Sequence, residues 1–344
     1  MNVLGYIRRR MMLFVLVLFG LSIITFTMVH LMPVDPVIMW GGEKASPELI
    51  ARVRAEYGLD KPLDIQYISY IKNIFKGNLG VSITTHHPVA EDIAMFFPAT
   101  LELVLVAWLI ILLIGLPLGI LSAVKAGGKL DNIGRTFALG GISTPLFWLG
   151  MLLQILLFKQ LNLLPLQGRI SDMVALLNPI KHITGLDLLD CIISGNWIAF
   201  RSALEHIIMP AITLSVTGMA MVTRMTRSCM LEILNKDYMI MAKTYGLPKW
   251  KIYFKYGLKN ALVPIITIAS MAICGNLMGS ILVESVFDWP GIGLYATRTI
   301  LQADFAPIMA VVLIMGVIYV SINLLVDILY SVIDKRIAYG EEQR

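Results

Sequence analysis

The sequence predicts an all-α integral membrane protein with six transmembrane helices. Of its 344 residues, 57% are hydrophobic and only 15% are charged, and the mean hydropathy is +0.77. Soluble domains carry about 25% charged residues. The apolar residues form runs of about 20, the length at which a helix crosses a bilayer. The expected spans are 11–31, 100–124, 135–158, 206–223, 261–283 and 306–333.

The N-terminal segment, residues 1–31, is predicted to be a short cytoplasmic tail followed by an uncleaved first span. Three arginines at positions 8–10 precede the apolar stretch. A signal peptide has a shorter apolar region of about 7–15 residues and a small-residue cleavage site, and neither is present.

Residues 32–99 form a polar interval, predicted to be extracytoplasmic, with two short amphipathic helices. In the first, Ser46 suits the N-cap and Pro47 the first helical position, and Gly58 ends it. The second is expected over residues 63–75, with apolar side chains on one face. We expect both helices to lie on the outer membrane face or on the protein itself.

No metal or disulfide site is predicted. His86 and His87 are adjacent on a loop, and such a pair is interpreted as loop rather than as metal ligands. The three cysteines, Cys191, Cys229 and Cys274, are scattered and odd in number, without a paired spacing.

The segment 100–333 is predicted to hold the other five spans and two long loops. An outer loop at 159–205 contains a stretch, 187–200, that is too short to cross the membrane and suggests an interfacial or re-entrant helix. A carboxylate within a span is a functional candidate. However, Glu102 is placed in the first turn of its span, where the helix dipole favours it.

The distribution of Lys and Arg orients the chain. Of the 28, 17 fall in the N-terminal tail, the loop 125–135, the loop 224–260 and the tail 334–344. The positive-inside rule then places both termini in the cytoplasm. The net charge of +5 is explained by topology and anionic lipid, so no nucleic-acid partner is predicted.

The chain shows no energy source of its own. A phosphate-cradling GxxxxGK[S/T] loop is missing, and the nearest fragment, 127–130, lacks the upstream glycine and the hydroxyl residue. The spans also lack the set of buried ionisable groups that coupled carriers use. We therefore predict no enzyme activity and no cofactor, and we expect a partner to supply the energy.

The basic stretch 232–264 is the predicted contact with that partner. Asn235 or Asp237 is expected to cap a short helix through Tyr245, Gly246 to end it in a left-handed turn, and Pro248 to start a second helix toward residue 256. An ordinary basic loop bound to anionic lipid is the alternative. The expected apolar contacts are Tyr238, Met241, Tyr245 and Leu247.

Eight short segments, spread in order over nearly the whole chain, carry a family signal. They are MPVDP at 32–36, YGLDKPL at 57–63, GNLG at 77–80, PATLEL at 98–103, RMTR at 224–227, DY at 237–238, NALVP at 260–264 and VESVFDWPGIG at 283–293. With these segments the chain resembles the inner-membrane permease subunits of ABC importers in the dipeptide/oligopeptide/nickel branch.

The resemblance implies a type I ABC importer permease fold in a prokaryotic inner or plasma membrane. Its implied partners are a second homologous permease, two cytoplasmic ABC ATPases and an extracytoplasmic solute-binding protein. It identifies the loop 224–260 as the segment coupled to the ATPases. Of the usual Glu-Ala-Ala-x-x-x-Gly core, Ala242 and Gly246 are kept, while Ile240 stands where the Glu would be. The coupling residues it implies are Asp237, Tyr238, Met241, Ala242, Tyr245, Gly246 and Leu247.

The expected solute is a di- or oligopeptide, on the prevalence of such importers in this branch. Nickel, glutathione and oligosaccharides remain alternatives within the same class. An autonomous secondary carrier or channel is the alternative of another class, and it would move solute without partners. A membrane enzyme has no supporting group of nucleophile, base or metal ligands.

Overall fold

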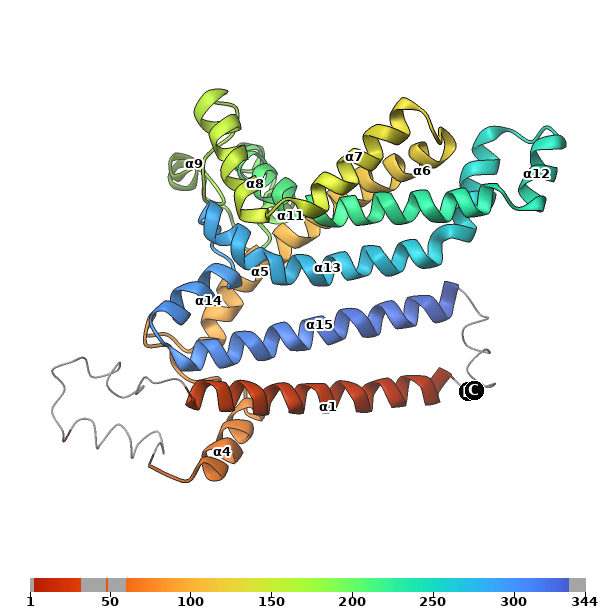
Figure 1. Ribbon diagram of the computed structural model, residues 1–344. Helices are drawn as coiled ribbons and strands as arrows, with labels where there is room; N and C mark the ends of the chain where they lie inside the picture. The colour runs from red at the N-terminus through yellow and green to blue at the C-terminus, as the bar shows by residue number, and fades with distance from the viewer. Residues whose placement is uncertain (1–2, 32–47, 49–59, 334–344) are drawn as a thin grey trace. The chain divides into compact units, whose positions relative to one another are not determined.

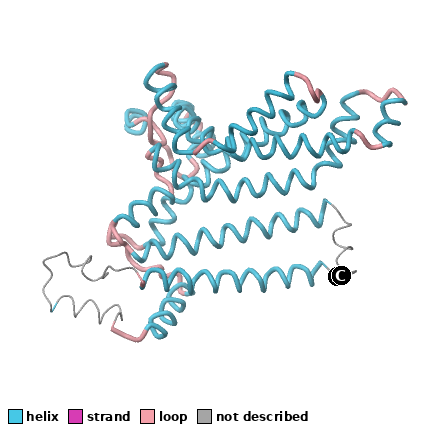
Figure 2. The backbone as a smooth tube through the Cα atoms, in the orientation of Figure 1, coloured by secondary structure: helices cyan, strands magenta, loops and turns pink. Residues whose placement is uncertain are grey.

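The computed structural model describes residues 3–31, 48 and 60–333. This part of the chain consists of helices and connecting loops (Figure 2), with one isolated antiparallel bridge between Val81 and Pro88. Within the described residues, five helices are long and apolar enough to cross a membrane, and a bent helix pair makes a sixth candidate. The predicted fold class is therefore confirmed. The helix expected between Ser46 and Gly58 lies outside the described residues, except for Glu48.

The chain divides into two compact units, and two of the three boundaries between them fall inside long helices, while the third lies in a loop. Unit 1 comprises residues 1–98 and 290–321, and unit 2 comprises 99–289 and 322–344.

Unit 1 contains two long apolar helices and shorter ones beside them. Its elements are α1 (Val3–His30), α4 (Leu63–Phe75), the start of α5 (Val89–Ile110), α14 (Ile292–Leu301) and most of α15 (Phe305–Ile333). The helix α4 has the predicted bounds and packs on α1 through an aromatic contact between Phe26 and Tyr67, with ring centroids 5.3 Å apart. Tyr67 Oη also lies 2.8 Å from Ser22 Oγ.

Two buried carboxylates in unit 1 hold the turn that contains His86 and His87. Ser82 Oγ donates to Asp304 Oδ2 at 2.7 Å, and Thr85 Oγ1 donates to Asp92 Oδ2 at 2.5 Å. Tyr295 donates its hydroxyl to the same oxygen of Asp92 at 2.8 Å. These bonds tie the turn to α5, α14 and the residue that precedes α15.

Unit 2 is built around α11 (Trp197–Leu234), which packs against α13 (Lys259–Phe287), α6 (Leu116–Val124) and α7 (Lys129–Ser143). The remaining helices lie toward its two ends. Figure 1 shows α9 (Asp172–Leu177) at one end of α11 and α12 (Asp237–Thr244) at the other. Also in this unit are the end of α5, α8 (Leu146–Leu153) and α10 (Asp187–Ser194), and π-helical stretches at Ile111–Gly115, Gln154–Gln160 and Lys251–Leu258.

Several helices extend beyond the apolar runs that predicted them. The second apolar helix begins at Val89 and continues to Val124, and α11 is 38 residues long instead of the expected 206–223. A helix continues past the membrane wherever a tertiary contact or cap supports it, and Asn196 Oδ1 caps α11 by accepting from Ala199 N. The single helix expected at 187–200 is instead two, because α10 ends before Gly195 and α11 starts at Trp197.

The third predicted span is broken rather than straight. The helices Lys129–Ser143 and Leu146–Gln160 meet at an angle of 109°. Thr144 and Pro145 are extended at the break. Proline lacks the N–H that would continue the helical ladder and disfavours helical geometry in the residue before it, which explains the position of the bend.

Close packing between α6 and α11 makes Gly119 a test of this core. A Cβ at Gly119 would lie 2.6 Å from Thr226 Cβ and 2.8 Å from the Thr223 carbonyl oxygen, and the backbone cannot move aside. We expect Gly119→Ala to lower the free energy of unfolding by about 1–3 kcal/mol, as overpacking does. Thermal unfolding in detergent measures it.

Gly140→Ala is the matched control, because nothing lies within 4 Å of its Cβ position in α7. Alanine is the better helix former, so this variant should be as stable as the unmodified protein or up to about 1 kcal/mol more stable. Equal destabilisation by both substitutions would contradict the packing described for α6 and α11.

Candidate functional site

The loop between α11 and α13 contains the predicted coupling helix, α12. The N-cap residue of α12 is Lys236, and no side chain makes a capping hydrogen bond there. The predicted capping by Asn235 or Asp237 is therefore wrong. Asp237 lies instead in the first turn, where the positive end of the helix dipole stabilises its negative charge.

The end of α12 follows the sequence prediction. Gly246 has φ +69°, and its N–H donates to the Lys243 carbonyl at 3.0 Å. The next N–H, that of Leu247, donates to the Ala242 carbonyl at 3.2 Å. This pair of bonds around a left-handed residue is a standard helix C-terminus and turns the chain sharply.

The second helix begins at Lys249, one residue after the predicted start at Pro248, and it is not a separate short helix. Lys251 N donates to the Pro248 carbonyl at 2.9 Å, and the helix then continues through the π-helical stretch into α13. Helical backbone from Lys251 to Phe287 is unbroken. Gly257 lies inside this helix and packs closely on Met230, with 3.1 Å between its Cβ position and the methionine Cε.

The structure divides the seven predicted coupling residues into two groups. Tyr238, Met241 and Tyr245 are 44%, 56% and 79% exposed, and Asp237 and Gly246 are exposed beside them. By contrast, Ala242 and Leu247 pack inward against a buried apolar cluster. Sequence reasoning missed further exposed apolar side chains around α12, although their apolar character within a charged loop was a usable signal. They are Ile240, Trp250 and Phe254.

The buried cluster beneath α12 fixes it to three longer helices. Met239 of α12 is fully buried and lies in one cluster with Met230 of α11, Ile120 of α6 and Ile265 of α13. Each buried apolar side chain of this size stabilises by about 1.5–3 kcal/mol. A displacement of α12 therefore acts directly on the ends of α6, α11 and α13.

A charged pair near the same end joins α7 to α11. Asp131 is buried and receives Arg227 Nε at 2.5 Å and Nη2 at 2.9 Å, one on each carboxylate oxygen. Gly127 N donates to Asp131 Oδ2 at 2.8 Å. A bidentate ion pair of this kind fixes the orientation of the two side chains as well as the distance between them.

A second charged network lies toward the other end of α11. Arg169 Nη2 is 2.6 Å from Glu102 Oε2, and Arg169 Nε is 3.1 Å from Asp187 Oδ2. Glu102 also accepts from Leu188 N at 2.7 Å. Since α5 starts at Val89, Glu102 lies well inside the helix, so the dipole explanation given from the sequence is wrong. The arginine and the backbone N–H stabilise this carboxylate instead.

The two aspartates of α10 have opposite pKa shifts. Burial raises the pKa of Asp187 to about 6, although the guanidinium of Arg169 opposes this shift. Burial would also raise the pKa of Asp190. However, hydrogen bonds from Thr184 Oγ1 and from the N–H groups of residues 183–185 lower the pKa of Asp190 below its ordinary value.

Comparison with known proteins gives full-length matches. The model of the family "Binding-protein-dependent transport system inner membrane component" matches residues 115–339, and the N-terminal model of such membrane components matches residues 3–104. The probable D,D-dipeptide transport system permease protein DdpB of Escherichia coli strain K12 is 44% identical over 97% of this chain and 97% of its own length.

Two further relatives extend the range of named solutes. The dipeptide transport system permease protein DppB of Escherichia coli strain K12 is 39% identical over 98% of this chain and 99% of its own. The glutathione transport system permease protein GsiC of Salmonella choleraesuis is 33% identical over 98% of this chain and 99% of its own.

The buried network around Arg169 predicts a large effect on stability. Removing its side chain by Arg169→Ala leaves the carboxylates of Glu102 and Asp187 buried without their shared cation. We expect a loss of about 3–5 kcal/mol in the free energy of unfolding. Arg201→Ala is the control, because its pair with Glu205 is exposed, and it should change stability by about 0–1 kcal/mol. Thermal unfolding that shifts equally in both variants would contradict the assignment.

The raised pKa of Asp187 predicts a pH dependence with a definite sign. The folded protein binds a proton near pH 6, whereas the unfolded chain binds it near the ordinary pKa of 3.8. Stability should therefore rise as the pH falls from 7 toward 4, and the contribution is complete below 3.8. We expect Asp187→Asn to flatten this rise in a series of thermal unfolding measurements. An unchanged slope in that variant would show that another group is responsible.

Proposed function

Because the chain belongs to the family of binding-protein-dependent transport system inner membrane components, we propose that it is the membrane-spanning permease subunit of an ATP-driven importer of dipeptides. It is a multi-pass protein of the inner membrane. The observation that carries the proposal is an exposed apolar surface on α12, fixed to the ends of the long apolar helices of unit 2.

Dipeptides are the favoured solute within this class. Relatives at 44% and 39% identity carry dipeptide transport in their names, and the relative named for glutathione is at 33%. These identities favour dipeptides over glutathione, nickel or oligosaccharides.

The system needs a solute-binding protein and ATPase subunits. In our proposal a second homologous permease completes the path, and two cytoplasmic ATPases drive it. ATP hydrolysis belongs to those subunits, because this chain carries no nucleotide loop. The exposed residues that would enter a groove of an ATPase are Asp237, Tyr238, Met241, Tyr245 and Gly246.

The coupling mechanism follows from how α12 is attached. When ATP binding closes the two ATPases, the groove that holds α12 moves. Ala242 and Leu247 do not face the groove but pack on the cluster below, so they act as positioning residues that hold α12 on the longer helices. The displacement then reaches α6, α11 and α13 together and switches access between the two membrane faces.

The proposed orientation places α12 and both termini in the cytoplasm and α4 in the outer leaflet. The helix α4 contacts α1 at both Ser22 and His30. These two residues are separated by about 12 Å along α1, at 1.5 Å per residue. That length extends inward from the outer end of an apolar span, so the exposed Ile65 and Ile68 of α4 face lipid in this arrangement.

Reconstitution of the chain with its co-encoded ATPases, second permease and binding protein tests the proposal. We expect dipeptide uptake into proteoliposomes that requires ATP and every partner. Gly246→Leu should reduce assembly with the ATPases or solute-stimulated ATP hydrolysis at least tenfold, because a bulky side chain there fills the space through which the groove approaches. Uptake by the chain alone without ATP would show an autonomous carrier instead.

Gly77→Leu is the matched control for backbone strain. Gly77 also follows a short helix, has φ +75° and has nothing within 4 Å of its Cβ position. Both substitutions carry the same cost of about 1–2 kcal/mol for a left-handed residue. Normal coupling in both variants would show that α12 does not contact the ATPase.

A further inference from the structure

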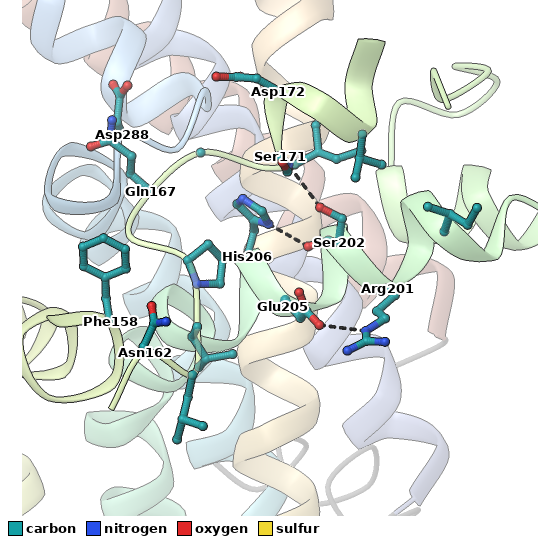
Figure 3. Close-up of a pocket in the computed structure, with 17 residues that line it drawn as sticks. Phe158, Asn162, Gln167, Ser171, Asp172, Arg201, Ser202, Glu205, His206 and Asp288 are labelled. Atoms are coloured by element: carbon teal, nitrogen blue, oxygen red, sulfur yellow. Dashed lines mark hydrogen bonds and ion pairs between the residues drawn. The ribbon is translucent and has the colours of Figure 1, made fainter. Parts of the chain in front are cut away.

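A large cavity lies in unit 2 at the start of α11, the end away from α12 (Figure 3). Its volume is about 900 Å³, within the range of roughly 300–1,000 Å³ found for small-molecule sites. The walls come from the chain between Phe158 and Val174, the first turns of α11 and Asp288 after α13.

His206 is held in this cavity by one ring nitrogen. Its side chain is buried, with 9% of the residue exposed, and Nδ1 lies 2.7 Å from the Ser202 carbonyl oxygen. A carbonyl only accepts, so Nδ1 carries a proton, and in the neutral form of the ring Nε2 is an acceptor. No hydrogen bond of Nε2 occurs within residues 60–333. Figure 3 shows the ring in the middle of the cavity, with Gln167 and Glu205 on different sides of it.

The loop that contains Ser171 faces His206, and it is hydrogen-bonded to Ser202, the residue of α11 that also holds the His206 ring. Ser171 N donates to Ser202 Oγ at 3.1 Å. The Ser202 side chain therefore holds the opposite wall, and the Ser202 carbonyl holds the His206 ring. The distance between the two walls is set by direct hydrogen bonds, so the site is built before any ligand arrives.

The charges on the lining favour a cationic group. Asp172, Glu205 and Asp288 bring three carboxylates, against the one guanidinium of Arg201. That guanidinium pairs with Glu205 at 2.9 Å, so the lining keeps a net negative charge, to which Asp172 contributes. Among the residues that the structure describes, no three His, Cys, Asp or Glu side chains are placed to share a metal ion. This favours an organic ammonium over a bare metal cation.

The remaining walls suit the rest of a short peptide. Asn162 and Gln167 offer amide groups that can both donate to and accept from a peptide bond. Phe158 and Ile198 provide apolar surface for side chains. A short peptide with a free amino terminus combines the three features that the lining selects, namely an ammonium, a polar backbone and variable side chains.

We propose that this cavity binds the amino-terminal part of the peptide during its passage, with the ammonium facing the carboxylates and His206 Nε2 accepting an N–H of the peptide. This inference rests on the proposed function and assigns a contact for its solute. It also predicts selection by charge, because a peptide with additional carboxylates is repelled by Asp172 and Glu205.

The test measures uptake by the complete reconstituted importer at a saturating concentration of solute-loaded binding protein, where the affinity of that protein no longer limits the rate. The probes are one lysine-containing and one glutamate-containing dipeptide. We expect His206→Leu to slow uptake of both by about 3- to 10-fold, as loss of one hydrogen bond does. The unmodified importer should take up the lysine-containing dipeptide faster than the glutamate-containing one. The double variant Asp172→Asn with Glu205→Gln should lose this difference in rate.

Two controls separate binding from folding. His206→Gln keeps an acceptor at this position, so it should recover most of the rate, whereas a purely structural role for the ring predicts equal loss in both variants. His86→Asn alters an exposed turn of unit 1, where asparagine tolerates the φ of +60°, and should leave uptake unchanged. Unchanged rates and unchanged charge preference in the cavity variants would overturn this site. Failure of the unmodified importer to move any dipeptide would overturn the proposed function instead.

Discussion

The packing of α11 against its neighbours is the constraint on which the rest of unit 2 depends. Small residues let the helices approach until almost no space remains, and at Gly218 a Cβ would lie 2.5 Å from Ile111 Cδ1. The helix is 38 residues long, about 57 Å at 1.5 Å per residue. Its first turns carry Ser202 and His206, and its last turns carry Met230 and the cluster under α12. The single, tightly packed helix α11 therefore connects the proposed solute cavity with the proposed ATPase contact.

Charged groups lie toward the two ends of α11, and each is paired with a group of opposite charge. Asp131 and Arg227 join α7 to α11 near the α12 end. Glu102, Arg169 and Asp187 join α5 to the segment before α11 near the other end. Buried charges of this kind are weak sources of net stability, but each admits few alternative partners. They therefore define the register in which the helix ends meet, while apolar packing supplies most of the stabilisation.

The hydropathy pattern was enough to predict the helical membrane fold, because the bilayer imposes one length on every span. Local signals also served well where short-range geometry decides the outcome. The bounds of α4 followed from its apolar periodicity and the glycine after it, and the left-handed residue Gly246 followed from the turn residues beside it. The same reasoning failed where a distant residue supplies the support, as for Glu102, whose partner Arg169 is 67 positions away in the chain.

By itself, the sequence determined the fold class, the approximate spans and the position of the loop that contains α12, since these depend on composition and on neighbouring residues. The tertiary structure decided which side of α12 faces outward, so that Tyr245 is exposed while Ala242 and Leu247 pack inward. It also decided the 109° break at Pro145 and the grouping of His206 with the carboxylates of the cavity. These features arise from contacts between segments far apart in the chain, and no local pattern encodes which segments will meet.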